Sequence, residues 1–351
     1  MKFARKQLHN TNERPFWTEK ENLEHIQKII QKEPNHFVQM LKAYRHGAMY
    51  NIIFPCAEMN LDDFFRDPNN KVDRNKPLRE NPLWKEMLGI CRALKHMVEG
   101  QVFGDDEKFV GYHFDLKPAN ILIFGEHTWQ IADFGQSVFR ATNGSSLKLT
   151  NPGGTDEYAP PENVDLGAKA SAKYDVWSMG CILLELITFL VTKGPRGIRA
   201  LDKARHTSNE RGSDHRLWTK TSTGQIELKP KIIKFTEGLL AASGPSEQHF
   251  LTQILELTNG MLEPDVGKRF SASRVVEMLK KIVENSTEPQ GNGETLLHRH
   301  ATALAVPLRS GPSVSSHALG IEDLSSRRCI SRETSLVTML TKLKVYPFRL
   351  A

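Results

Sequence analysis

Two short motifs constrain this chain more than any other feature: HFDLKPANIL at residues 113–122 and IADFGQS at residues 131–137. They place Asp115 five residues before Asn120, and Asp133 thirteen residues after Asn120. The runs ILIF and WQIAD around them are short and apolar, which predicts two extended segments. Asp115 and Asn120 then lie on a predicted loop, and Asp133 lies at the end of a short strand.

These side chains suit the transfer of a phosphate from a nucleotide. Such a transfer needs Mg²⁺ against the phosphates and a hydroxyl aimed at the γ-phosphorus. Mg²⁺ prefers oxygen ligands, of which a protein usually supplies one or two, and Asn120 and Asp133 offer them. Asp115 can accept the proton of the hydroxyl, and Lys117 can neutralise developing charge. The alternative is turn chemistry, because Asp and Asn favour turns; three such groups in register beside a lysine favour the functional interpretation.

Hydrophobic periodicity predicts a chain of two parts. Residues 2–8 are strand-like, residues 14–32 have a helical period, and two apolar runs separated by Arg45-His46-Gly47 indicate a hairpin. NLDDFF and WKEMLGICRALKHMVE are also predicted to be helical. Further helical patterns cover 174–191, 231–241, 247–262 and 271–284. Strands followed mostly by helices predict an α+β protein with two lobes and a cleft between them.

The motifs HFDLKPAN and DFG resemble the catalytic loop and metal-binding motif of the eukaryotic protein kinases, at that family's spacing of eighteen residues between the aspartates. GGTDEYAPPE (153–162), DVWSMGCILLEL (175–186) and PDVGKRFSA (264–272) follow in the family's order. The resemblance implies a two-lobed kinase-like fold that binds ATP and Mg²⁺ and phosphorylates a serine or threonine of a protein substrate. It also implies that Thr155 lines the substrate pocket.

Two structural contacts are implied by the same resemblance. Asp175 would bind the backbone of the catalytic loop, and Arg269 would pair with Glu162. The second contact would be a buried ion pair that holds the large lobe together, with no direct catalytic role.

The resemblance extends more loosely to the N-terminus. FARK (3–6) is similar to the strand that carries the family's phosphate-binding lysine, which makes Lys6 that lysine and Glu19 its ion-pair partner. AMYNIIFPCAEMNLDDFF (48–65) is similar to the strand and hinge that hold the adenine, where Phe54 would limit the back of the pocket and Cys56 would lie in the hinge. The hinge and the long basic insert resemble a fungal kinase-like group.

These correspondences divide the chain into three predicted parts. They are a partial small lobe with hinge (1–57), a large lobe (58–284) with a basic insert at about 192–230, and a disordered tail (285–351) rich in Ser, Gly and polar residues.

The chain departs from the family in three places, of which one is a small change: Pro160 stands at a turn-like position where the family has Ala. The first two strands and the Gly-rich loop need roughly thirty residues before the lysine, whereas five precede Lys6 and no GxGxxG occurs there. The small lobe is therefore expected to be incomplete, with an unpaired strand edge. Phe114 replaces the arginine that normally grips an activation-loop phosphate, so phosphorylation of that loop is not the expected switch.

The departures leave alternatives to an active protein kinase. One is a pseudokinase or truncated, inactive protein that keeps the fold for binding. A small-molecule phosphotransferase of the aminoglycoside type is less favoured, because such proteins are not expected to carry GTDEYAPPE or the Arg269 motif.

Charge and composition bear on partners and compartment. The formal charge is +6, and the excess of Lys and Arg falls in residues 192–230 (net +5) and 285–351 (net +3). Solvated loops explain this better than a nucleic-acid surface. The four cysteines lack pairing or metal spacing and no secretory signal is visible, which predicts an intracellular protein, in the cytoplasm or nucleus. The apolar run 176–191 is short and contains Glu185, which predicts a core helix and no membrane span. A monomer is expected.

Overall fold

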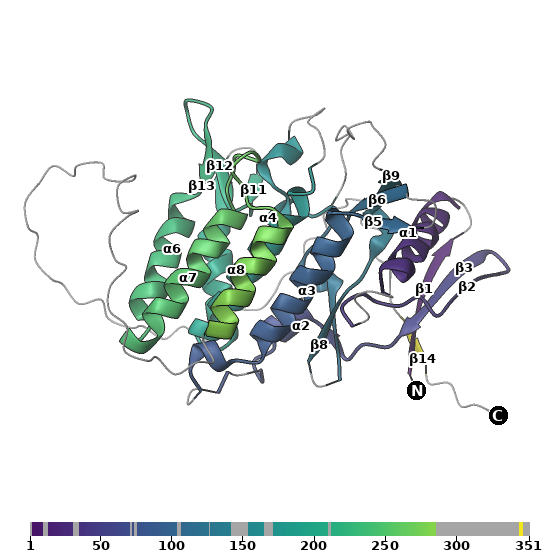
Figure 1. Ribbon diagram of the computed structural model, residues 1–351, viewed down its shortest axis with the longest axis horizontal. Coiled ribbons are helices and arrows are strands. Elements are labelled where there is room, and N and C mark those ends of the chain that lie inside the picture. The colour runs from purple at the N-terminus through teal and green to yellow at the C-terminus, as the bar shows by residue number, and fades with distance from the viewer. Residues whose placement is uncertain are drawn as a thin grey trace, which may run out of the picture. The chain divides into compact units, whose positions relative to one another are not determined.

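The computed structural model describes residues 2–9, 13–30, 35–70, 72–73, 76–103, 107–125, 127–141, 154–164, 171–209, 212–285 and 344–346. Strands and helices alternate up to residue 141, and helices form most of the described chain from Tyr174 onward (Figure 1). The helices are α1 (Arg14–Ile30), α2 (Leu61–Arg66), α3 (Leu83–Val98), α4 (Tyr174–Val191), α5 (Pro195–Arg205), α6 (Pro230–Ala242), α7 (Pro245–Met261) and α8 (Ala272–Asn285). The predicted α+β class is confirmed.

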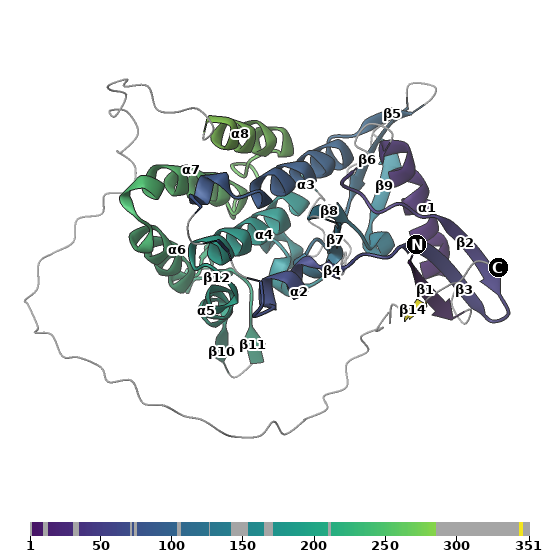
Figure 2. The ribbon, with the colours of Figure 1, turned by 90° about the horizontal axis from the view of Figure 1, so that it is seen from below.

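The small lobe contains an antiparallel sheet beside α1 (Figure 2). β1 (Phe3–His9) pairs with β3 (Met49–Pro55), which pairs with β2 (Lys42–His46). A two-residue turn joins β2 to β3, and Gly47 adopts φ +58° there, a conformation that favours glycine. Phe16 of α1 stacks on Tyr50 of β3, with ring centroids 4.5 Å apart. The predicted strand, helix and hairpin are therefore confirmed.

The expectation of an unpaired strand edge in this sheet is wrong. β14 (Lys344–Tyr346) pairs antiparallel with β1, with Ala4 opposite Val345. Backbone N–H and C=O groups at a strand edge are satisfied by such an added strand. These three residues belong to the tail that was predicted to be disordered, and residues 286–343 and 347–351 lie outside the described part of the chain.

Two small sheets bracket the catalytic motifs. β4 (Met59–Asn60), β7 (Ile121–Phe124) and β8 (Thr128–Ile131) form one, which confirms the two predicted extended segments. β5 (Gln101–Phe103), β6 (Glu107–Tyr112) and β9 (Val138–Ala141) form the other, which the sequence did not predict. The catalytic loop leaves β6 and enters β7, so both of its ends are fixed by strands.

The large lobe is built around α4. Figure 1 shows α6, α7 and α8 side by side, and α4 contacts α5 and α7. By length and apolarity α4 could cross a membrane, but 94% of it is buried inside the protein, as in a core helix. Burial raises the pKa of Cys181 in α4 and of Cys91 in α3 to about 12, so neither thiol is a nucleophile at neutral pH.

The basic insert is folded, contrary to the expectation of solvated loops. It contains α5 and two hairpins, β10 (Thr207–Asn209) with β11 (Gly212–Asp214), and β12 (Trp218–Lys220) with β13 (Ile226–Leu228). Ile198, Leu201 and Trp218 are buried, as are the charged side chains of Arg205 and Lys229. The net charge of the insert did not indicate that it folds, because the insert has few apolar residues. It also does not show that two of its charged side chains, Arg205 and Lys229, are buried.

Candidate active site

Asp175, at the start of α4, holds the beginning of the catalytic loop. Its carboxylate accepts hydrogen bonds from the backbone N–H groups of His113 (2.7 Å) and Phe114 (2.9 Å), as expected. Burial raises the pKa of Asp175, and the two N–H groups oppose that shift. Phe114 has φ +63°, a left-handed conformation that is uncommon outside glycine. The loop is thus bent just before Asp115 and tied to the most buried helix.

Asp115 lies at the centre of a hydrogen-bonded cluster. Lys117 Nζ lies 2.9 Å from Asp115 Oδ2 and 2.7 Å from Thr155 Oγ1. The Thr155 hydroxyl donates to Asp115 Oδ1 at 2.9 Å. This geometry shows that the carboxylate can accept a hydrogen bond from an alcohol while a cation stands beside both groups. The predicted catalytic residues Asp115 and Lys117 are brought together, and Thr155 joins them from the segment 154–164.

Asn120 connects this cluster to the nucleotide side. Its amide nitrogen donates to the backbone oxygen of Asp115 (2.8 Å) and to Asp115 Oδ2 (3.1 Å). The amide is thereby oriented, and its carbonyl oxygen is the atom suited to a cation. Asn120 also lines the cavity that contains Lys6 and Asp133.

Lys6, Glu19 and Asp133 form the second cluster. Lys6 Nζ lies 2.8 Å from Glu19 Oε1 and 2.9 Å from Asp133 Oδ1. Burial opposes the charge of Lys6, but the two carboxylates outweigh it and raise its pKa. Burial raises the pKa of Glu19 despite Lys6. For Asp133, burial acts in the same direction but Lys6 outweighs it and the pKa falls, so this carboxylate is anionic at neutral pH.

The cavity between these residues has a volume of about 500 Å³, within the range of small-molecule sites. Phe54 and Cys56 line it, as predicted, together with the residues of the second cluster and Asn120. Its apolar walls include side chains that the motif comparison did not single out, namely Ala4, Val38, Leu122 and Ala132. A flat apolar ring can lie between such walls.

The residues fit ATP and Mg²⁺. Mg²⁺ in nucleotide sites takes one or two protein ligands and fills its remaining positions with phosphate and water. Asn120 and Asp133 provide two oxygen donors on one cavity, and the Asp133 side chain is 42% exposed. Among the described residues, no group of three or more His, Cys, Asp or Glu could hold a metal by itself. The donor set therefore suits a metal that arrives with a nucleotide.

Two further side chains join the motifs, and the sequence did not reveal them. His113 Nε2 lies 3.0 Å from the backbone oxygen of Ala132, and His113 Nδ1 accepts from Asp115 N at 3.3 Å. Asn22, three residues after Glu19 on α1, donates to the backbone oxygens of Phe134 and Ser137, both at 2.8 Å. Residues three apart lie on the same face of a helix. The spacing of Glu19 and Asn22 was therefore the sequence signal that could have identified Asn22.

Phe114 lies in an aromatic cluster. Its ring stacks on Tyr112 with centroids 5.4 Å apart and meets Tyr174 edge-on at 5.0 Å. An arginine at this position would face an anion, whereas the phenylalanine packs against rings. The cluster supports the catalytic loop by apolar contact. The prediction about activation-loop phosphorylation concerns residues 142–153, which lie outside the described residues.

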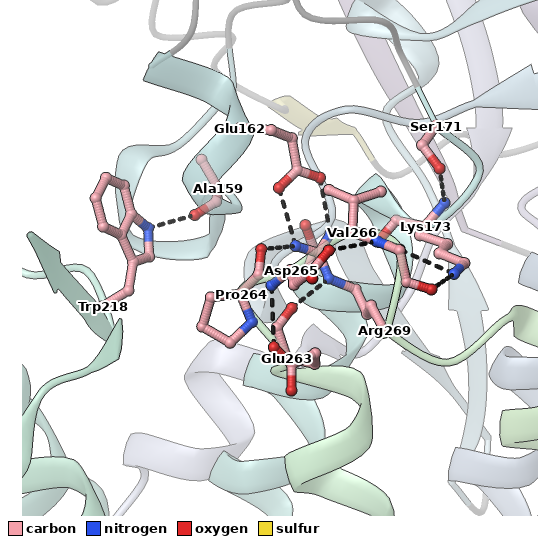
Figure 3. A network of polar contacts seen from close by, with 12 residues as sticks. Ala159, Glu162, Ser171, Lys173, Trp218, Glu263, Pro264, Asp265, Val266 and Arg269 are labelled. Carbon is pink, nitrogen blue, oxygen red and sulfur yellow. Dashed lines mark hydrogen bonds and ion pairs between the residues drawn. The ribbon is translucent and has the colours of Figure 1, made fainter. Parts of the chain in front are cut away.

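The expected ion pair between Glu162 and Arg269 is present (Figure 3). Arg269 forms two parallel bonds with the carboxylate, at 2.7 and 2.9 Å, and its side chain is completely buried. Arg269 also donates to the backbone oxygens of Glu263 and Lys173. The pair joins the end of the segment 154–164 to the loop between α7 and α8.

Comparison with known proteins agrees with this geometry. A family model described as protein kinase domain matches residues 1–279. Receptor-interacting serine/threonine-protein kinase 3 of Homo sapiens is 40% identical over 95 residues, which cover 27% of this chain and 18% of that protein. An LRR receptor-like serine/threonine-protein kinase of Arabidopsis thaliana is 30% identical over 223 residues, covering 64% and 36%. Mitogen-activated protein kinase 14C of Drosophila melanogaster is 26% identical over 301 residues, covering 80% and 78%. The chain thus spans well under half the length of the first two relatives.

Proposed function

The chain belongs to the protein kinase family, and we propose that it transfers the γ-phosphate of ATP to serine or threonine hydroxyls of a protein. The observation that carries this proposal is the position of Asn120, which lines the nucleotide-sized cavity and also holds Asp115 through its amide. The amide nitrogen of Asn120 thus holds the candidate base Asp115, and its carbonyl oxygen is the candidate metal ligand.

On the nucleotide side, Lys6 would bind phosphate oxygens while Glu19 holds its ammonium group in place. Phe54 and Cys56 line the cavity; in this proposal Phe54 would limit its back and Cys56 would lie in the hinge, where the adenine would bind between apolar walls. Asn120 and Asp133 would hold Mg²⁺, which when bound neutralises phosphate charge. The residues of the chain thus orient the nucleotide and set its charge.

On the acceptor side, Asp115 would accept the proton of the attacking hydroxyl. Lys117, 2.9 Å from Asp115, would offset charge that develops on the transferred group. The bond from Thr155 to Asp115 supports this role, because it shows an alcohol in contact with the base. General base catalysis of this kind contributes about 10²- to 10⁴-fold to a rate.

We also propose an intracellular protein, in the cytoplasm or nucleus, that acts as a monomer on protein substrates and needs no nucleic acid or membrane. Cys56, Cys91 and Cys181 are free thiols, which suits a reducing compartment; Cys329 lies outside the described residues.

The test is Mg²⁺-dependent transfer from labelled ATP to a generic basic protein, with Asp115→Asn and Asp133→Asn beside the parent. We expect the parent to transfer phosphate and each variant to lose at least about 10²-fold of that rate. Glu256→Gln is the matched control, because Glu256 is an exposed carboxylate on α7, and its rate should equal that of the parent.

The alternative function is a kinase-fold protein that binds partners without transfer. The observation behind it is the 2.9 Å contact between Lys6 and Asp133, which engages one of the two carboxylate oxygens of Asp133, so that transfer requires Lys6 to turn from Asp133 to the phosphates. If the parent and both variants were equally inactive while all bound nucleotide, this alternative would replace the proposal.

A further inference from the structure

The insert that contains α5 makes specific contacts with the acceptor side of the cleft. We call residues 193–229 the α5 segment. Its first anchor is Arg205, whose side chain is 3% exposed and whose Nη2 lies 2.7 Å from Glu185 Oε1 of α4. The Tyr158 hydroxyl donates to the same carboxylate oxygen at 3.0 Å, and the Arg205 guanidinium lies 5.3 Å from the centre of the Tyr158 ring. Arg205, Glu185 and Tyr158 therefore form one buried unit.

The second anchor is Trp218, from the first strand of the second hairpin. Its indole N–H donates to the backbone oxygen of Ala159 at 3.3 Å, as Figure 3 shows. Lys229 ties the α5 segment together, because its Nζ donates to the backbone oxygens of Arg205 (2.7 Å) and Asp214 (3.2 Å). A folded, internally bonded element thus contacts two successive residues, Tyr158 and Ala159.

These two residues are one short turn away from the candidate base. Tyr158 N–H donates to Thr155 O at 3.0 Å and Ala159 N–H to Asp156 O at 3.3 Å, so residues 155–159 form a single hydrogen-bonded turn. The Thr155 hydroxyl, at the start of that turn, donates to Asp115. A shift of Tyr158 would therefore move the group that touches the base.

We propose that the α5 segment positions the acceptor side of the active site, with Arg205 as the principal positioning residue and Trp218 as the second. Arg205 supplies the cation for the buried carboxylate of Glu185 from within the chain. The acceptor side is then built before any substrate binds. The proposal rests on the proposed kinase function for its effect on substrate, but its effect on residues 155–159 does not depend on catalysis.

The test is amide hydrogen exchange of the full chain, read at Tyr158 and Ala159, in Arg205→Ala and Trp218→Phe. Trp218→Phe keeps a buried aromatic ring and removes the N–H donor, so it remains informative if Arg205→Ala fails to fold. Arg199→Ala is the control, because Arg199 is exposed on the same helix. We expect these amides to exchange about tenfold faster in Arg205→Ala, and less than that in Trp218→Phe, with α8 unchanged.

With phosphate transfer measured in parallel, the KM for the acceptor protein should rise about fivefold in Arg205→Ala while the KM for ATP stays within about twofold. Exchange that matches the Arg199→Ala control, or that accelerates equally in α8, would overturn the proposal. If the parent transfers no phosphate, the proposed function fails, whereas the exchange of Tyr158 and Ala159 still decides whether the α5 segment positions this turn.

Discussion

At the scale of single residues, the nucleotide side of the cleft depends on how Lys6 is shared between two carboxylates. Glu19 is buried and Asp133 is partly exposed to the cavity, yet both lie within 2.9 Å of the same ammonium group. Under the proposed function, Lys6 would turn from Asp133 to the phosphate oxygens of the nucleotide and keep Glu19 as its anchor. In this arrangement Glu19 would hold Lys6 in place when Asp133 binds Mg²⁺.

This sharing predicts the effect of Glu19→Gln. A hydrogen bond to a charged group contributes about 1.5–3 kcal/mol, so loss of the Glu19 carboxylate should weaken the binding of Mg²⁺-ATP about tenfold or more. Titration calorimetry with a non-hydrolysable ATP analogue measures this effect. Glu21→Gln, an exposed carboxylate on the same helix, is the control, and equal affinities in the two variants would contradict the prediction.

The residues that their spacing alone predicted are those whose chemistry is concentrated in short motifs. Asp115, Lys117, Asn120 and Asp133 were identified because their spacing along the chain suffices. Arg205 was missed because its meaning depends on Glu185, twenty residues away on another helix. A buried arginine in a polar stretch is indistinguishable from a solvated one until the fold supplies its partner.

At the scale of elements, α1 is coupled to the segment after Asp133 by a ring stack as well as by Asn22. His25 stacks on Phe139 of β9 with centroids 5.1 Å apart and lies 5.3 Å from Phe109 of β6. Burial lowers the pKa of His25, and the nearby Lys28 lowers it further, while Glu21 and Glu24 oppose the shift. An uncharged imidazole is thus favoured between the two rings.

This environment predicts a pH dependence of stability. The unfolded chain binds a proton at His25 near pH 6.5, and the folded chain binds it only at lower pH. Between those two values the unfolded state holds more protons, so the free energy of unfolding falls as the pH falls below about 6.5. His25→Phe keeps the ring stack and should reduce that fall.

Urea unfolding at pH 7.5 and at pH 5.5 tests this expectation, because the parent should lose more stability on acidification than His25→Phe. His249→Asn, which changes an exposed histidine on α7, should behave like the parent. A parent and His25→Phe that lose the same amount would show that this stack does not sense pH.

Long periodic elements were predictable and short or polar ones were not. The main helices show their apolar face in the sequence, so their positions agree with the pattern. β5, β6 and β9 are three to six residues long, too short for alternation to stand out. β14 pairs with a strand more than 330 residues earlier in the chain, and no local pattern encodes such a partner.

At the scale of the whole molecule, buried polar contacts join the two sides of the cleft to the helical core, and three of those between described residues involve charged side chains. Asp175 holds the catalytic loop from α4, Arg205 holds Tyr158 from α5, and Arg269 holds Glu162 from the loop before α8. Asp175 and Arg205 each fix a functional segment to a helix, and Arg269 fixes one to the loop that leads into α8. The helices of the core could be predicted from the apolar pattern. The contacts of Asp175 and Arg269 were implied by the family resemblance, whereas the contact of Arg205 required the three-dimensional arrangement.

Arg269 provides the clearest test of this arrangement. Its guanidinium is fully buried, bonds both oxygens of Glu162 and lies 5.1 Å from the Trp177 ring. Removal of one partner from a buried ion pair costs about 3–5 kcal/mol, because the other charge is left without compensation. Arg269→Ala should therefore lose about that much free energy of unfolding in urea titrations. Lys280→Ala, which breaks an exposed pair with Glu284, should change it by no more than about 0.5 kcal/mol. Equal losses in the two variants would mean that the ion pair between Arg269 and Glu162 does not contribute to the free energy of unfolding.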